Sequence, residues 1–318
     1  MNVENGKKLK SLLGNGCKEY VNLKNYTSIK IGGVADYFFE AKKIEDLIKA
    51  VMTARECKVP FFILGSGSNI LISDVGFAGL VIHNTCSNIS ITSSNGQIIA
   101  DSGVKLSSLI VKAVSVGLGG LETFYGIPGT LGGAVYGNSG AYGAEIFDFI
   151  KNVTLLTPNN KLINKTKEWF QSEYHSTKLK KDHDKNYIIL TVKLQLANNK
   201  KEQLIEKINK IKKVRDEKLG GLGPSCGSIF KNPKPGKSYL TKEEAKRNSA
   251  GYILENIGAK KMQIGDAGIF SRHANIIENK KNAKAIEVRM LIDKMREEAY
   301  AQTGKNLEEE IEYIGQWE

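Results

Sequence analysis

Residues 126–145 read GIPGTLGGAVYGNSGAYGAE and constrain the fold more than any other segment, because seven of these twenty positions are glycine and only Glu145 is charged. Glycine backbone is entropically costly to order, so such a run is kept where another group approaches the main chain closely. Ala134, Val135, Tyr136 and Tyr142 are apolar enough to be buried between the glycines. The run therefore predicts either a cradle for a phosphate, diphosphate or flat cofactor, or a cluster of structural turns.

The chain has no segment that reads as a membrane anchor or a secretory signal. Gly129, Gly133 and Gly137 have the four-residue spacing of close helix–helix contacts, but a membrane-spanning helix needs about twenty apolar residues. Asn138 and Glu145 interrupt such a segment here. The first residues, MNVENGKKLK, are basic without a following apolar core. We expect a cytoplasmic protein with no membrane partner.

Length and composition are those of an ordinary globular protein. The 318 residues are 41% hydrophobic and 25% charged, enough for two domains or for one domain with an extension. The cysteines, at positions 17, 57, 86 and 226, lack the paired spacing of metal ligands, so we expect reduced thiols and no metal site.

The net charge of +12 raises the question of a nucleic-acid partner. Residues 161–218 hold sixteen Lys and Arg against eight Asp and Glu. These basic residues are mostly scattered lysines without interleaved aromatics or a nucleic-acid motif, so we expect a solvated surface and no nucleic acid. The positive electrostatic potential of these residues would also attract a small anionic substrate.

Hydrophobic periodicity and turn residues predict the helices and strands. Asn95-Gly96 predicts the turn of a hairpin over 89–101. The apolar strand 61–64 leads into Gly65-Ser66-Gly67-Ser68-Asn69, a position where phosphates are commonly held, although the third glycine of the dinucleotide fingerprint is missing. Helices are expected near the N-terminus and over 44–57, 106–116, 200–218, 241–257 and 282–302, and strands over 28–41 (broken at Gly32-Gly33), 187–196, 268–270 and 307–314.

Several segments, taken together and in order, are similar to one enzyme family over nearly the whole chain. They are SIKIGGVADYF, LGSGSNILISD, GIPGTLGGAVYGNSGAYGAE, PSCGSIFKNP, AGYILENIGAKKMQIGDAG, SRHANIIEN and LEEEIEYIG. The sequence resembles the UDP-N-acetylenolpyruvoylglucosamine reductase family, flavoenzymes of cytoplasmic peptidoglycan precursor synthesis. The short distance from Tyr174 to the loop at 225–233 indicates the shorter subtype, which lacks an extra substrate-covering insertion.

The resemblance implies an α+β fold, in which a two-lobed FAD-binding domain of the vanillyl-alcohol-oxidase (PCMH) type precedes an α+β substrate-binding domain. We expect a helical extension over 1–20, the FAD-binding domain over 21–200, a connecting helix and linker over 201–224, and the substrate domain over 225–318. A monomer is expected.

The same resemblance implies FAD as cofactor and NADPH as hydride donor. Two segments would wrap the FAD diphosphate with backbone N–H groups. Their expected cofactor-binding residues are Gly65, Ser66, Gly67, Ser68 and Asn69 in the first, and Gly126, Ile127, Pro128, Gly129, Thr130, Gly132, Gly133, Asn138, Gly140, Ala141 and Gly143 in the second.

The implied reaction reduces the enolpyruvyl group of a UDP-sugar to give UDP-N-acetylmuramate. Hydride addition places negative charge on the neighbouring carbon and its carboxylate, so the site must stabilise that charge and then supply a proton. The family assigns protonation to a serine matching Ser228, and a substrate-carboxylate contact to a glutamate matching Glu310, which would have to carry or share a proton. Expected substrate-binding residues are Tyr174, Lys231, Asn232 and Asn275.

Read without the family, these residues have simpler interpretations. Ser228 alone is a loop serine, and Cys226 is close enough to be mistaken for the reactive group. Glu310 stands in an acidic stretch that would ordinarily be solvated, and a register error of one residue would select the wrong carboxylate. His273 is expected to be structural or next to the substrate, since no clustered metal ligands accompany it.

One position departs from the family pattern. The family has an arginine after a tyrosine where this chain has His175 after Tyr174. Arginine is always charged, whereas histidine is charged only near or below pH 6.5 unless an anion holds its proton. Either His175 is a weaker, pH-sensitive cation, or a lysine such as Lys178 takes the role, or the chain is a catalytically altered or idle flavin-binding relative.

Overall fold

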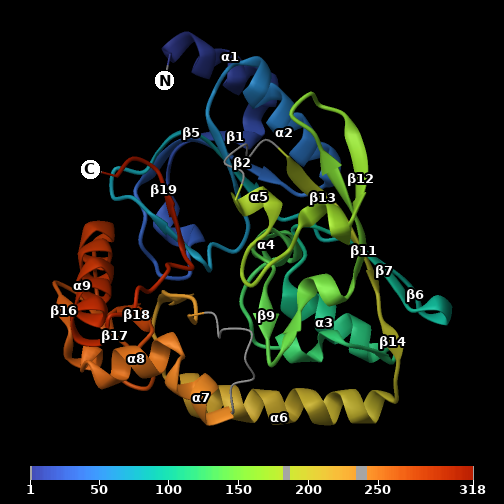
Figure 1. The fold of residues 1–318 in the computed structure, drawn as a ribbon. Coiled ribbons are helices and arrows are strands. Elements are labelled where there is room, and N and C mark those ends of the chain that lie inside the picture. Colours follow the sequence, from blue (N-terminus) through green and yellow to red (C-terminus); the bar gives the residue numbers. More distant parts are fainter. Residues whose placement is uncertain (1, 182–186, 234–241, 318) are drawn as a thin grey trace. The chain divides into compact units, whose positions relative to one another are not determined.

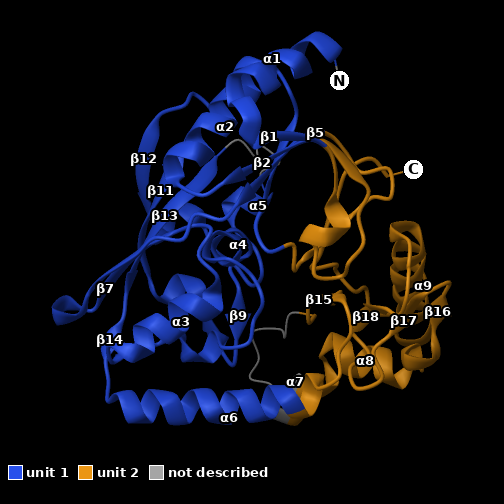
Figure 2. Cartoon of the chain, turned by 180° about the vertical axis from the view of Figure 1, so that it is seen from behind, with its two compact units in different colours: residues 1–19, 37–66, 79–216 blue, residues 20–36, 67–78, 217–318 orange. Residues whose placement is uncertain are grey.

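A computed structural model describes residues 2–181, 187–233 and 242–317. The chain divides into two compact units (Figure 2): unit 1 comprises residues 1–19, 37–66 and 79–216, and unit 2 comprises residues 20–36, 67–78 and 217–318. The domain ranges expected from the sequence are continuous along the chain, whereas these units are not. Residues 20–36 and 67–78 pack with residues of the C-terminal region in unit 2. The expected division at 20, 200 and 224 stays a prediction.

Unit 1 is built as two α+β lobes (Figure 1). Its buried apolar side chains form two separate clusters. The helices and strands of which at least half lies in it are α1 Val3–Leu13, β1 Cys17–Asn22, β2 Val34–Ala41, α2 Ile44–Glu56, β3 Phe61–Leu64, β5 Phe77–Asn84, β6 Ile89–Thr92, β7 Gln97–Asp101, α3 Leu106–Ser115, β8 Leu118–Gly119, α4 Leu131–Gly137, β9 Gly140–Ala141, β10 Ala144–Glu145, β11 Ile150–Leu156, β12 Leu162–Thr166, α5 Lys178–Lys181, β13 Ile188–Gln195, β14 Ala197–Asn198 and α6 Lys201–Leu219.

The first lobe consists of a sheet in the order β1-β2-β5-β3 with helices α1 and α2. Helix α2 forms as its periodicity predicts, because Leu47, Ala50, Val51 and Ala54 recur on one face and are buried in the lobe's core. Its first turn is closed by the Asp46 carboxylate, which accepts the Lys43 N–H at 3.2 Å.

The second lobe holds an antiparallel sheet in the order β12-β11-β13-β7-β6. The predicted hairpin over 89–101 is confirmed, and Gly96 provides its left-handed turn residue at φ 67°. Helix α3, with Leu109, Ile110 and Ala113 fully buried, covers the core beneath this sheet.

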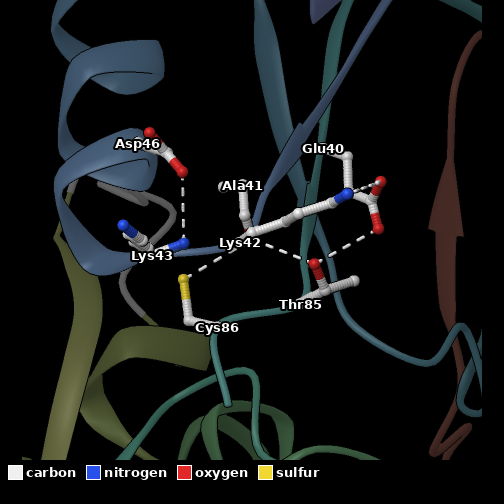
Figure 3. A network of polar contacts seen from close by, with 7 residues as sticks. All are labelled: Glu40, Ala41, Lys42, Lys43, Asp46, Thr85 and Cys86. Carbon is white, nitrogen blue, oxygen red and sulfur yellow. Dashed lines mark hydrogen bonds and ion pairs between the residues drawn. The ribbon is translucent and has the colours of Figure 1, made fainter. Parts of the chain in front are cut away.

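The cysteines at 17, 57, 86 and 226 are free and buried, as expected for reduced thiols. Cys86 illustrates why such a thiol is inert (Figure 3). Its Sγ lies 3.5 Å from the Ala41 carbonyl oxygen. The same carbonyl and the Glu40 carboxylate accept hydrogen bonds from Thr85 Oγ1. The pKa of the Cys86 thiol is raised to about 12, and burial is the largest cause of this shift.

Unit 2 is also α+β, with an antiparallel sheet in the order β15-β18-β17-β16 and a separate parallel pair, β19 with β4. Its core brings Ile29, Ile31 and Leu71 together with residues of the C-terminal region. The elements are β4 Ile70–Ile72, β15 Ser225–Ser228, α7 Lys242–Arg247, α8 Ala250–Asn256, β16 Gln263–Ile264, β17 Ala267–Ile269, β18 Ile276–Asn279, α9 Ala285–Thr303 and β19 Glu312–Ile314.

Three sequence predictions differ from the structure. The helix expected over 241–257 is two helices, because Ser249 caps α8 by accepting the Tyr252 N–H; Thr241, its expected first residue, lies outside the described residues. The strand expected over 307–314 is regular only at Glu312–Ile314. Residues 28–31 form a turn and coil in place of a strand, because the Ser28 and Lys30 N–H groups bond to Gly67 and Thr27.

Asp74, the last residue of LGSGSNILISD, caps a helix more than two hundred residues away. Its carboxylate oxygens accept the N–H groups of Ala285 at 2.8 Å and Ile286 at 3.1 Å, in the first turn of α9. We expect Asp74→Ala to lower the free energy of unfolding by about 1–2 kcal/mol, because two helix N–H groups lose their acceptor. Urea denaturation measures the change, with Asp216→Ala on α6 as the charge-matched control. Equal stability of the two variants would contradict the assignment.

Candidate functional site

The glycine run forms a loop at 126–129, the short helix α4, and the two-stranded hairpin of β9 and β10. Thr130 caps α4, since its Oγ1 accepts the Gly133 N–H at 3.3 Å. Asn138 ends α4 in a left-handed conformation with φ 46° and is fully buried. Tyr142, which was expected to be buried, is exposed, so the run lies partly in the second lobe's core and partly at its surface.

Part of the glycine requirement comes from the protein itself. A Cβ at Gly132 would lie 2.9 Å from the Ser102 Cβ, and a Cβ at Gly65 would lie 2.7 Å from Thr130 Oγ1. These glycines let main chain and side chains approach closely. Gly137 and Gly143, by contrast, face open space, so close packing does not explain them.

The hydrogen bonds at the start of α4 limit which backbone N–H groups could contact a diphosphate. The Leu131 N–H donates to Val104 at 2.8 Å, the Gly132 N–H donates to Ser102 at 2.7 Å, and the Gly133 N–H goes to Thr130. A diphosphate would therefore use the preceding loop, where Gly126 and Gly129 both have positive φ and Gly126 is exposed. A glycine loop with exposed main chain fits FAD, and these contacts stay a prediction.

The Tyr174–His175 turn is fastened directly to the glycine run. Asn138 Nδ2 donates to the Glu173 carbonyl at 2.8 Å, and Thr177 Oγ1 donates to the Tyr136 carbonyl at 2.7 Å. The turn closes on itself through paired backbone bonds between Glu173 and Ser176. The expected cofactor and polarising segments, about thirty residues apart in sequence, are therefore neighbours within unit 1.

His175 sits at the tip of this turn in a left-handed conformation with φ 49°, which is uncommon outside glycine, asparagine, aspartate and histidine. Its half-buried imidazole packs edge-on against the Tyr174 ring, with centroids 4.4 Å apart.

Lys178, the expected substitute for His175, begins helix α5 and does not lie along a strand. Its Nζ lies over the Trp169 ring, 5.0 Å from the centroid. Such cation–π packing restrains the ammonium group at the aromatic face. Which of the two side chains acts as the cation stays a prediction.

A second group of expected site residues gathers in unit 2 around strand β15. Ser228 ends β15 and is paired with Ile276 of β18. The next residue, Ile229, accepts the Glu310 N–H at 2.7 Å. Lys231 N–H donates to the Glu308 carbonyl at 2.8 Å, so the segment after Ser228 runs beside the segment that carries Glu310. The structure therefore brings the two expected catalytic segments together through their backbones.

Ion pairs distinguish the glutamates of the acidic stretch. Glu308 pairs with Lys231, and Glu309, largely buried, pairs with Arg296 on α9. These two carboxylates thus each have a basic partner. The role of Glu310 in the substrate contact stays a prediction.

Two of the expected substrate-binding residues also hold the backbone. Asn275 is buried; its Oδ1 accepts the Phe230 N–H at 2.9 Å and its Nδ2 donates to the Phe230 carbonyl at 2.8 Å. Asn232 Oδ1 accepts the Ala250 N–H at 3.0 Å. The side-chain amide of Asn275 therefore fixes the strand next to Ser228, and its contact with substrate stays a prediction.

The alternative reactive groups near this cluster are both suppressed by burial. Burial raises the pKa of the Cys226 thiol to about 12, so it carries no thiolate at neutral pH. Burial, followed by the charges of Lys218 and Lys260, lowers the pKa of His273, whose Nδ1 accepts the Asn275 N–H at 3.3 Å. The lowered pKa favours the neutral imidazole of His273 at neutral pH. Within the described ranges, no three His, Cys, Asp or Glu side chains form a metal-binding group.

Sequence reasoning missed residues that hold this cluster together. Ser28 Oγ donates to the Ser225 carbonyl at 2.6 Å, and Asn279 Nδ2 donates to the Ile29 carbonyl at 3.1 Å. The signal was present in the motifs SIKIGGVADYF and SRHANIIEN, but a motif does not say which distant backbone its polar side chain will meet.

The expected cofactor residues fall into both units: Gly65, Ser66 and the glycine run in unit 1, and Gly67, Ser68 and Asn69 in unit 2. Among the described helices, none is long and apolar enough to cross a membrane.

Comparisons with known proteins agree with this architecture. A family model described as an FAD-binding domain matches residues 35–165. The chain is therefore an FAD-dependent oxidoreductase with a separate C-terminal domain. That domain, residues 216–314, matches the model for the C-terminal domain of UDP-N-acetylenolpyruvoylglucosamine reductase, and the chain belongs to the UDP-N-acetylenolpyruvoylglucosamine reductase family.

The relatives are similar over nearly their full length. The UDP-N-acetylenolpyruvoylglucosamine reductase of Borrelia garinii is 37% identical over 92% of this chain and 92% of its own, and that of Caldicellulosiruptor saccharolyticus is 38% identical over 93% and 91%. The crystal structure of the Thermus caldophilus enzyme superposes with a TM-score of 0.76 at 29% identity, covering 93% of this chain and 98% of that one. The predicted α+β fold is confirmed.

Proposed function

We propose that this chain uses NADPH and FAD to reduce the enolpyruvyl group of UDP-N-acetylglucosamine-enolpyruvate, giving UDP-N-acetylmuramate for peptidoglycan synthesis. The observation that carries the proposal is the backbone pairing of the Ser228 and Glu310 segments, 2.7 Å from the Glu310 N to the Ile229 O, in a member of this reductase family. We further propose that it works in the cytoplasm as a monomer.

FAD, when bound and reduced by NADPH, would supply the hydride for the terminal carbon of the substrate double bond. This chain's residues would do the rest. Ser228 Oγ would donate the proton that completes the addition, and Glu310 would hydrogen-bond the substrate carboxylate as charge builds there. Lys231 and Asn232 would contact the diphosphate, and His175 would face the developing negative charge.

The test follows the flavin colour of the purified protein. We expect a yellow protein that NADPH bleaches and that the enolpyruvyl substrate reoxidises under anaerobic conditions. Bleaching without substrate-dependent reoxidation would overturn the proposal. It would favour a catalytically idle flavin-binding relative, in which His175 does not replace the arginine of the family.

The pH dependence of turnover tests His175 separately. If protonated His175 is the polarising cation, turnover falls as pH rises and the imidazole loses its proton, and His175→Arg flattens the profile because arginine stays charged. The measurement is the rate of flavin reoxidation between pH 5.5 and 9 in both proteins. Lys178→Gln is the matched control and keeps the histidine profile. An unchanged profile in His175→Arg would rule out the histidine as that cation.

A further inference from the structure

Asn69 holds the main chain on both sides of Ile311. Its Nδ2 donates to the Glu310 carbonyl at 3.2 Å, and its own carbonyl accepts the Glu312 N–H at 3.1 Å. From the next residue onward, β4 and β19 continue the same pairing in parallel, with Ile70 opposite Glu312. Asn69 is therefore the residue at which the C-terminal strand is joined to the GSGSN loop.

Glu310 needs this support because it lies outside regular secondary structure. It stands between the isolated bridge at Glu309 and the start of β19 at Glu312. Its N–H is held by Ile229 and its carbonyl by Asn69, so both neighbouring peptide groups are fixed by hydrogen bonds from different segments. The direction of the Glu310 side chain depends on those two peptide planes.

The loop that presents Asn69 is itself firmly anchored. Gly67 accepts the Ser28 N–H at 3.0 Å, and Ser28 Oγ donates to Ser225 at the start of β15. Gly67 has φ +60°, and a Cβ there would lie 2.3 Å from the Tyr26 carbonyl. Asn69 is thus placed with reference to the strand that carries Ser228.

We propose that Asn69 is a positioning residue for Glu310, which it sets against the Ser228 strand, and that its side-chain amide is not a ligand of FAD. The proposal rests on the proposed function, in which Glu310 contacts the substrate. Loss of the amide donor leaves the Glu310 carbonyl without this partner and lets the 310–311 peptide rotate, and a displacement of about 1 Å in a reacting group costs roughly a hundredfold in rate.

A double-mutant cycle tests the proposal on the full chain with bound FAD. Asn69→Ala should keep the flavin content, the flavin dissociation constant and the rate of bleaching by NADPH, while substrate-dependent reoxidation slows about ten- to a hundredfold. In the Glu310→Ala background the same replacement should have no further effect, because Asn69 acts through Glu310. Asn69→Ser, which keeps a shorter donor, gives an intermediate rate and serves if Asn69→Ala does not fold.

Asn95→Ala, in the exposed hairpin turn where Asn95 Oδ1 accepts the Gln97 N–H, is the matched control and leaves every rate unchanged. Weakened flavin binding in Asn69→Ala would make Asn69 a cofactor ligand and overturn the inference. So would an undiminished effect of the replacement in the Glu310→Ala background. Failure of the proposed function would look different, since the unmodified protein would itself not be reoxidised by substrate.

Discussion

Replacing Ser228 with alanine should slow substrate-dependent reoxidation by about 10²–10⁴-fold, the usual contribution of a positioned proton donor. Flavin binding and bleaching by NADPH should stay as in the unmodified protein, because neither involves the proton that completes reduction of the double bond. Stopped-flow absorbance of the flavin separates the two half-reactions. Ser228→Cys, which keeps a donor at the same position, should recover part of the rate.

Ser225→Ala is the matched control, because Ser225 begins the same strand and its carbonyl, not its side chain, receives the Ser28 hydrogen bond. Its reoxidation rate should stay within about twofold of the unmodified rate. If Ser228→Ala is equally harmless, another group donates the proton. Cys226 is a poor candidate for that role, since its thiol is fully enclosed.

Local sequence signals were sufficient where the structure depends on neighbouring residues. The hairpin at Asn95-Gly96 and helix α2 form as expected, because a left-handed glycine and an apolar stripe act within a few residues. The ordered motifs gave the family and the α+β fold, and comparison with solved and curated relatives confirmed both.

The remainder depends on contacts between distant segments, which periodicity does not encode. Nothing local indicates that Asp74 caps α9, that Ser28 meets Ser225, or that Asn69 joins Glu310. These bonds explain why residues 20–36 and 67–78 belong to unit 2. The acidic stretch shows the same limit. A strand was expected over 307–314, whereas Glu308 and Glu309 pair with Lys231 and Arg296, and regular strand pairing begins only at Glu312.

Replacing Glu310 with alanine should slow reoxidation about 10²–10³-fold, the cost of removing one hydrogen-bond donor from a developing anion. The comparison with Glu310→Gln is more informative, because a glutamine amide donates a hydrogen bond as a protonated carboxyl does but does not titrate. If Glu310 acts in its protonated form, the reoxidation rate of Glu310→Gln stays within about tenfold of the unmodified rate. Any fall in the rate at high pH that comes from deprotonation of Glu310 is then absent from Glu310→Gln. Glu297→Ala, an exposed glutamate of α9, is the control. Equal damage in Glu310→Gln and Glu310→Ala would instead mean that the ionised carboxylate is required, as a base or as an ion-pair partner.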